Sequence, residues 1–162
     1  AGRWCRRLRQ AAGEADATFL ALAGLNRLGV HGTGHPLDAH EWLPAPGQAA
    51  IAIECRADDH AMRTLLAAID DPASHAALVA ERALLAALGG NCHSPVAALT
   101  EPADGMLRLT ARLYSPDGVE SVTGQATFAP GDLAAPAALA ADLLARASSA
   151  IAVHFAGPAN SK

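Results

Sequence analysis

The chain has 162 residues, of which 51% are hydrophobic, 4% aromatic and 17% charged. This length excludes a large multidomain enzyme, and this composition excludes a wholly disordered chain. The formal net charge of -4 argues against nucleic acid or an anionic membrane as the partner. No apolar run approaches the ~20 residues that cross a bilayer. The three cysteines show no disulfide or zinc spacing, so we expect a protein of the reducing cytoplasm.

The first third of the chain predicts isolated elements joined by loops. Residues 3–12 predict a helix that ends at Gly13, and we interpret this basic start as mature protein rather than a signal peptide. The continuous apolar run over residues 17–23 predicts a buried strand of an α/β sheet, with a buried helix as the alternative. Residues 24–29 predict a short helix or loop, and the Gly, His and Pro of residues 30–46 predict a surface connection.

Two further elements are predicted before residue 70. Residues 49–55 are a short apolar run bounded by turn residues, which predicts a second buried strand. A helix is expected over residues 60–69, with Asp58 or Asp59 as its cap, because a carboxylate accepts hydrogen bonds from the free N–H groups of a first turn. The two aspartates could instead be an acid–base pair, but we favour capping. Two buried strands without visible neighbours are typical of parts of a larger sheet.

From about residue 72 onward the sequence predicts a complete α+β unit. Ser74 is expected to cap a helix that runs from His75 to Ala87 and stops at Gly89. Apolar and polar residues then alternate in three segments, which predict three antiparallel strands over residues 95–99, 106–114 and 119–128. A stretch rich in Ala and Leu from residue 132 to about 155 predicts one long closing helix.

The loop after the helix over residues 75–87 is the most informative local feature. Two glycines precede Cys92 and give the backbone freedom to present its thiol. His93 could assist deprotonation of that thiol, because only the thiolate is a strong nucleophile. The alternative is a small buried cysteine in a turn, which the spacing alone favours because it defines neither a base nor an oxyanion partner. The residues themselves leave both roles open.

Two other clusters carry weaker chemical signals. The loop that holds His31, His35 and His40 could gather a metal with nearby acids, but it fits no standard zinc motif, so we expect a solvent-exposed loop and no metal. Four arginines between residues 3 and 9 concentrate positive charge in an otherwise acidic chain, which makes an anionic small molecule a possible ligand. The alternative for these arginines is a solvated helix face.

Three stretches, in this order, resemble the porphobilinogen deaminase family, also called hydroxymethylbilane synthases, which are transferases of tetrapyrrole and haem biosynthesis. They are ALAGLNRLG at 21–29, LPAPGQAAIAIECR at 43–56 and ERALLAALGGNC at 81–92. The resemblance runs from near residue 6 through the closing helix and corresponds to the C-terminal half of the family's usual length. It implies the α+β C-terminal domain preceded by partial α/β segments of a periplasmic-binding-protein-like two-domain body. The implied parts are residues 1–43 as the end of domain 2, 44–70 as a segment returning to domain 1, and 71–162 as the cofactor-carrying domain 3.

The resemblance also implies a covalent cofactor. In the family, a cysteine in a Gly-Gly-x-Cys loop holds a dipyrromethane cofactor through a thioether, and Cys92 is the matching residue. Porphobilinogen becomes electrophilic as it loses ammonia, so a thiol or a free pyrrole carbon can attack it. By resemblance, the cofactor then accepts four porphobilinogen units. No metal is implied.

Several residues match positions that contact the carboxylates or line the cleft in the family. Every pyrrole carries acetate and propionate groups, which arginine forks bind. Arg27 matches one such arginine, and a second falls on Arg6 in an ungapped match or on Arg7 if an Arg-Leu pair is matched. Gly24 and Gln48 lie in cleft motifs. The family's usual glycine after the Gly-Gln pair is replaced by Ala49.

The resemblance implies substrate partners but assigns no catalytic residue here. The family's catalytic aspartate belongs to an N-terminal domain that matches no part of this sequence, so this chain alone is expected to have little or no activity. The expected partners are porphobilinogen and the growing polypyrrole, with a separate N-terminal domain or a second copy of the chain left open. The alternative function is a non-catalytic interaction module that oligomerises through the edge of the strand over residues 49–55.

Overall fold

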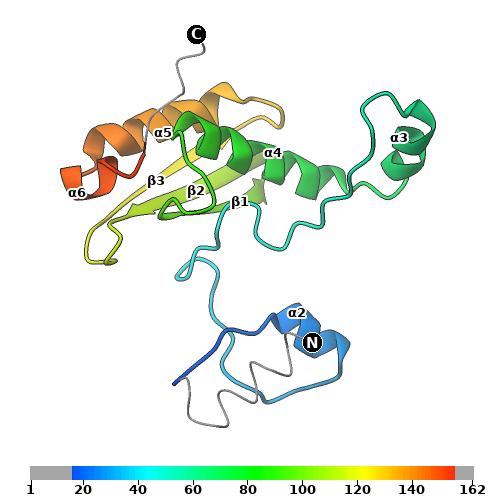
Figure 1. Ribbon diagram of the computed structural model, residues 1–162, viewed down its shortest axis with the longest axis horizontal. Coiled ribbons are helices and arrows are strands. Elements are labelled where there is room, and N and C mark those ends of the chain that lie inside the picture. The colour runs from blue at the N-terminus through cyan, green and yellow to red at the C-terminus, as the bar shows by residue number, and fades with distance from the viewer. Residues whose placement is uncertain (1–15, 156–162) are drawn as a thin grey trace. The chain divides into compact units, whose positions relative to one another are not determined.

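The computed structural model describes residues 16–155. The chain divides into two compact units, residues 1–38 and 39–162. The helix predicted over residues 3–12, with Arg6 and Arg7, lies outside the described residues. Figure 1 shows the helices and strands of the described part.

The first unit contains one short helix, α2, over Leu22–Arg27. It confirms a helix within residues 24–29, and Gly29 follows it in the left-handed region with a φ of 63°. The strand predicted over residues 17–23 is wrong: residues 17–21 have no regular structure, and Phe19 is 70% exposed. A buried strand needs neighbours for its N–H and C=O groups, and the one sheet of residues 16–155 lies in the other unit. The connection that follows is mostly exposed, as predicted.

The second unit begins with a segment of turns and irregular backbone, which leads into the helix α3 over His60–Ala67. Asp59 caps α3 as predicted, since its Oδ1 accepts the N–H of Met62 at 2.9 Å. The strand predicted over residues 49–55 is wrong, because this segment has no regular structure and Ile51 is 92% exposed. Oligomerisation through the edge of a strand at this place therefore loses its structural basis.

Helix α4 spans Pro72–Ala87 and begins differently from the prediction. Its cap is Asp71, whose Oδ2 accepts the N–H of Ser74 at 2.9 Å, so Ser74 is not the cap. Pro72 suits the first position of a helix because its φ is fixed and it has no N–H to satisfy. Hydrogen bonds from the side chain and backbone of Ser74 lower the pKa of Asp71. The contribution of this cap is therefore present above the pKa of the unfolded chain and lost as the pH falls through the lowered value.

The predicted three-stranded antiparallel sheet is confirmed, with β1 over Val96–Ala103, β2 over Met106–Tyr114 and β3 over Ser121–Phe128. Asp104 and Gly105 both have positive φ, as the two-residue turn between β1 and β2 requires. In β2, the buried residues alternate with more exposed ones, so one face of the sheet is apolar.

Helices α4 and α5 cover that apolar face of the sheet (Figure 1). The core lies between these two layers and is the only large buried cluster in the described part of the chain. Its members are Ala80, Leu84, Leu88, Val96, Ala98, Leu107, Leu109, Ala111, Leu113, Phe128, Leu139, Ala140, Leu143, Ile151 and Phe155. The predicted α+β class is thus confirmed for this part of the chain.

The closing helix is shorter than predicted. Helix α5 spans Ala134–Arg146, and a separate turn of helix, α6, spans Ser149–Ala152. The backbone is extended at Ala147 and at Ser148, whose carbonyl accepts the N–H of Ala152 at 2.8 Å. Ser148 precedes α6 but makes no capping hydrogen bond through its side chain, so the break lies in the extended backbone of these two residues.

Candidate functional site

The loop that carries Cys92 leaves α4 through a well-defined helix end. Gly89 has a φ of 64°, and its N–H donates to the carbonyl of Ala86 at 3.0 Å. The N–H of Gly90 donates to the carbonyl of Leu85 at 2.9 Å. These two bonds form a Schellman motif, which requires a left-handed residue at the position of Gly89. The direction of the loop is therefore fixed by the helix.

A compact hydrogen-bonded turn then presents Cys92. The N–H of Asn91 donates to Ser94 Oγ at 2.9 Å, and the N–H of Ser94 donates to the carbonyl of Asn91 at 3.0 Å. The N–H of His93 donates to Asn91 Oδ1 at 2.8 Å. Cys92 therefore sits in a turn whose flanking residues are tied to one another, with the strand β1 beginning directly after it.

The thiol of Cys92 is exposed and forms no disulfide. The alternative of a small buried cysteine is therefore wrong. His93 is also exposed. An exposed thiol at a fixed position between a helix end and a strand can be reached by an electrophile without unfolding of the core.

Gln48 lies in a second tight turn of the same unit. Its side chain is exposed, and its N–H donates to the carbonyl of Ala45 at 3.0 Å. Gly47, within this turn, has a φ of 70°, and its carbonyl accepts the N–H of Ala50 at 3.2 Å in an overlapping turn that begins at Gly47. Pro44 lies just upstream of this turn, and its carbonyl accepts the N–H of Ala98 in β1 at 2.8 Å. This bond ties the segment to the edge of the sheet.

Ala49 adopts a backbone conformation that favours glycine. Its φ is 64°, which crowds the Cβ of an L-residue. We predict that Ala49→Gly raises the free energy of unfolding by about 0.5–1 kcal/mol. Glycine relieves the backbone strain, and part of that gain is offset by the larger entropy of glycine in the unfolded chain. The control is Ala50→Gly, which removes the same methyl group where φ is negative and is expected to be neutral or destabilising. Urea unfolding of both variants measures the difference, and an equal effect of the two would contradict the prediction.

Sequence reasoning missed Glu81, a buried carboxylate that joins the turn of Gln48 to strand β1. Its side chain is on α4, and the residue is only 8% exposed. Oε2 accepts the N–H of Gly47 at 2.7 Å, and Oε1 accepts the N–H of Thr100 in β1 at 2.9 Å. The available signal was an acid at helical spacing between Leu78 and Leu84, on the apolar stripe of the helix.

The remaining predicted site residues lie elsewhere. Gly24 and Arg27 are on α2 of the first unit, where Gly24 is partly buried and Arg27 is exposed in the last turn. Arg6 and Arg7 fall outside the described residues. The loop of Cys92 and the turn of Gln48 thus both lie in the second unit, whereas Gly24 and Arg27 lie in the first.

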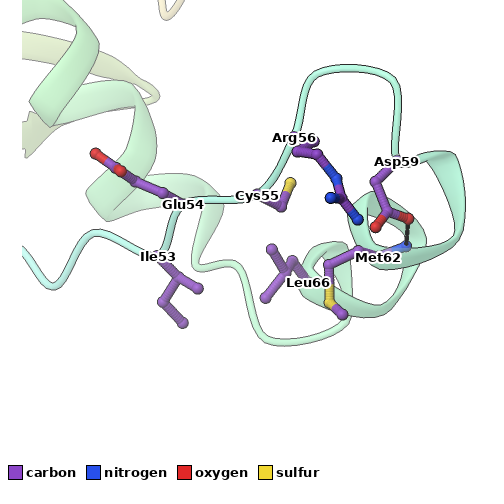
Figure 2. Close-up of a pocket in the computed structure, with 7 residues that line it drawn as sticks. All are labelled: Ile53, Glu54, Cys55, Arg56, Asp59, Met62 and Leu66. Atoms are coloured by element: carbon purple, nitrogen blue, oxygen red, sulfur yellow. Dashed lines mark hydrogen bonds between the residues drawn. The ribbon is translucent and has the colours of Figure 1, made fainter.

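A hollow of about 490 Å³ lies between the segment over residues 53–56 and α3 (Figure 2). It is lined by Ile53, Glu54, Cys55, Arg56, Asp59, Met62 and Leu66. Figure 2 shows that the hydrogen bond drawn in it is the cap of α3, from the N–H of Met62 to Asp59. None of the predicted site residues lines this hollow.

The described residues form neither a metal-binding cluster nor a helix that could span a membrane. Residues 16–155 contain no group of three or more His, Cys, Asp or Glu side chains that could hold a metal ion. Of the predicted loop histidines, His40 lies 3.6 Å from the carboxylate of Glu101. None of the helices in the described part of the chain has the length and apolar character needed to span a membrane.

Two family models match the sequence. The model described as "Porphobilinogen deaminase, dipyromethane cofactor binding domain" matches residues 2–64. The model described as "Porphobilinogen deaminase, C-terminal domain" matches residues 76–147. Cys92 falls in the second range, and every other predicted site residue falls in the first.

Curated proteins named porphobilinogen deaminase are similar to most of the chain. The protein from Sphingopyxis alaskensis is 54% identical over 147 residues, which cover 90% of this chain and 46% of that protein. The one from Nitrobacter hamburgensis is 44% identical over 148 residues, or 90% and 47% of the two chains. The one from Paracoccus denitrificans is 44% identical over 132 residues, or 81% and 41%.

The chain spans about half the length of these curated relatives. The two family models nevertheless describe domains of the same protein and lie in order along the sequence. The predicted resemblance is thereby confirmed. The chain belongs to the porphobilinogen deaminase family, with residues 2–64 in its dipyrromethane cofactor binding domain and residues 76–147 in its C-terminal domain.

Proposed function

We propose that this chain carries the cofactor tether and part of the carboxylate-binding wall of a hydroxymethylbilane synthase. The reaction joins four porphobilinogen units onto a dipyrromethane cofactor and releases ammonia from each. The observation that carries the proposal is the exposed, free thiol of Cys92 in a hydrogen-bonded turn of a chain from this family. We place the reaction in the cytoplasm because the cysteines show no disulfide spacing.

Cys92 is suited to form the thioether. Its sulfur would form a bond to the aminomethyl carbon of porphobilinogen while the C–N bond of that carbon breaks. The leaving amine takes the electron pair and a proton and departs as ammonia, so neither an oxidant nor a metal is needed. The bound cofactor supplies a free pyrrole carbon as the acceptor of further units. The fixed turn keeps the sulfur at one position relative to α4 and β1.

The carboxylates of the pyrroles require donors that the chain can supply. We assign this role to Arg27, to Arg6 or Arg7, and to the side-chain amide of Gln48, with Gly24 as a further cleft residue. Arg27 and Gln48 are both exposed, and a guanidinium group can bind a carboxylate with two parallel hydrogen bonds. We assign no residue of this chain to the proton transfer steps, and expect the 162-residue polypeptide on its own to turn over little porphobilinogen.

The proposed function implies a division of the chain into three parts. We assign residues 1–43 to the end of domain 2, residues 44–70 to a segment of domain 1, and residues 71–162 to domain 3. Domains 1 and 2 would form a two-domain body of the periplasmic-binding-protein type. In support, the helices and sheet from α4 onward share one core, whereas α2 and α3 bury none of their residues.

Intact mass spectrometry tests the proposed function directly. The purified chain is incubated with porphobilinogen, denatured and weighed, and the modified peptide is then mapped. We expect a covalent dipyrromethane on the peptide that contains Cys92 after a long incubation, because one slow attachment per chain needs no repeated turnover and a thioether survives denaturation. A bare thiol in every molecule after incubation would contradict the proposal. Unmodified chain from the same preparation, incubated without porphobilinogen, is the control.

A further inference from the structure

We infer that Glu81 is a positioning residue that fixes the Gln48 turn on the helix that ends at Cys92. The inference rests on the proposed function for its chemical meaning, since that function gives Gln48 and Cys92 a common ligand. Its physical basis is independent of any ligand. Glu81 is a buried residue, only 8% exposed, and both of its carboxylate oxygens bind backbone N–H groups, so we assign it no direct contact with a substrate.

The geometry requires a carboxylate rather than any polar group. Both oxygens of Glu81 accept backbone N–H groups, from Gly47 at 2.7 Å and from Thr100 at 2.9 Å. A carboxamide of the same shape has only one acceptor oxygen, so it can satisfy one of the two N–H groups and leaves the other unpaired. The buried hydroxyl of Thr100 has no hydrogen-bond partner among the described residues, so it does not share this carboxylate.

The two N–H groups have no regular partner without Glu81. Thr100 lies in β1, which is an edge strand of the sheet. One edge of β1 pairs with β2, and no strand of the described residues pairs with the edge that carries the N–H of Thr100. Gly47 begins the turn that contains Gln48, and a Cβ on Gly47 would lie 3.0 Å from Leu78 Cδ1 of α4. The glycine thus allows the turn to approach α4, and the carboxylate holds it there.

Beyond this contact, the chain loses its connection to the core. In the described part of the chain, the hydrogen bonds of residues 48–59 reach only Ala45 and Gly47 upstream, one another, and α3, so none of them ends on α4, α5 or the sheet. Ile51 and Ile53 in this segment are exposed. The position of Gln48 is therefore set by the bond from Gly47 to Glu81, together with the bond from Ala98 to Pro44 upstream.

Helix α4 transmits this constraint to Cys92. Glu81 lies within α4, and the Schellman motif at the end of the same helix fixes the loop of Cys92. One helix thus sets the positions of both the tether and the Gln48 turn. Loss of the bond from Gly47 to Glu81 would free the turn while the core of α4, α5 and the sheet stays packed.

The test compares Glu81→Gln with Glu120→Gln in the full 162-residue chain. Glu120 is an exposed acid near the turn between β2 and β3, so the control makes the same chemical change away from the clamp. Amide hydrogen exchange is followed for peptides over residues 44–50 and 107–113. In Glu81→Gln we expect exchange over residues 44–50 to be about tenfold faster, with little change over residues 107–113. Glu81→Asp keeps both acceptor oxygens on a shorter side chain and should fall between wild type and Glu81→Gln.

A second measurement links the clamp to the ligand. Alkylation of Cys92 by iodoacetamide should proceed at the wild-type rate in Glu81→Gln, whereas attachment of dipyrromethane from porphobilinogen should slow about tenfold. Unchanged exchange over residues 44–50 would overturn the inference, and so would equal acceleration of both peptides or unchanged attachment. If the wild-type chain attaches no cofactor, the proposed function fails, and the exchange measurement still decides whether Glu81 fixes the turn.

Discussion

Replacement of Cys92 by serine abolishes covalent attachment of dipyrromethane, and this is the largest effect that we expect from any single substitution. Serine has nearly the same shape, and the turn is held by Asn91, Ser94 and the backbone of His93 rather than by the thiol. Without a dedicated base, a hydroxyl group is a far weaker nucleophile than a thiolate. The serine therefore forms no ether bond to the cofactor. Intact mass after incubation with porphobilinogen should show only the unmodified chain.

Cys55→Ser is a matched control for this substitution. Cys55 is also free and exposed, but it lies beside α3 in the hollow of Figure 2 rather than in the turn after α4. This variant should carry the cofactor to the wild-type extent. A modified Cys92→Ser chain would show that another thiol accepts the cofactor, and an unmodified Cys55→Ser chain would show that Cys55 rather than Cys92 is required. Either result would overturn the assignment of the tether.

The elements that sequence reasoning predicted well are those whose signals are local. The alternation of Leu107, Leu109, Ala111 and Leu113 marks β2, and the Asp104–Gly105 turn marks its pairing with β1. The end of α4 could be predicted from Gly89 for the same reason. A helix often ends at a glycine in the left-handed conformation, and that conformation depends only on the neighbouring residues. The start of α4 was predicted at His75 with Ser74 as its cap, which is wrong: Asp71 is the cap and the helix begins at Pro72.

The strands predicted over residues 17–23 and 49–55 failed because burial is not a local property. Their apolar runs fit the interior of a sheet, yet a strand exists only where another strand pairs with it. Among residues 16–155, the sheet contains β1, β2 and β3 alone. Ile51, at 92% exposure, shows that an apolar residue without neighbours stays in solvent whatever its sequence pattern suggests.

Only part of the candidate site could be predicted, because some of its contacts join residues that are distant in sequence. The loop of Cys92 could be located from its glycines, but spacing alone could not decide whether its thiol was buried or exposed. Glu81 was missed because both of its partners are backbone N–H groups distant in sequence, in Gly47 and Thr100. Side-chain patterns do not record such contacts. An acid on an apolar helix face nevertheless indicates that its carboxylate accepts hydrogen bonds from buried donors.

Leu84→Ala in α4 is expected to lower the free energy of unfolding by about 2–5 kcal/mol, because it removes a fully buried side chain and leaves a cavity. Leu84 is 0% exposed in the core that joins α4 to the sheet, so the loss affects the helix that carries both Glu81 and the loop of Cys92. The matched control is Leu65→Ala in α3, where the side chain is 67% exposed and the expected change is within about 0.5 kcal/mol. Urea unfolding followed by circular dichroism measures both. Similar changes in the two variants would mean that α3 is packed as tightly as α4, contrary to the structure.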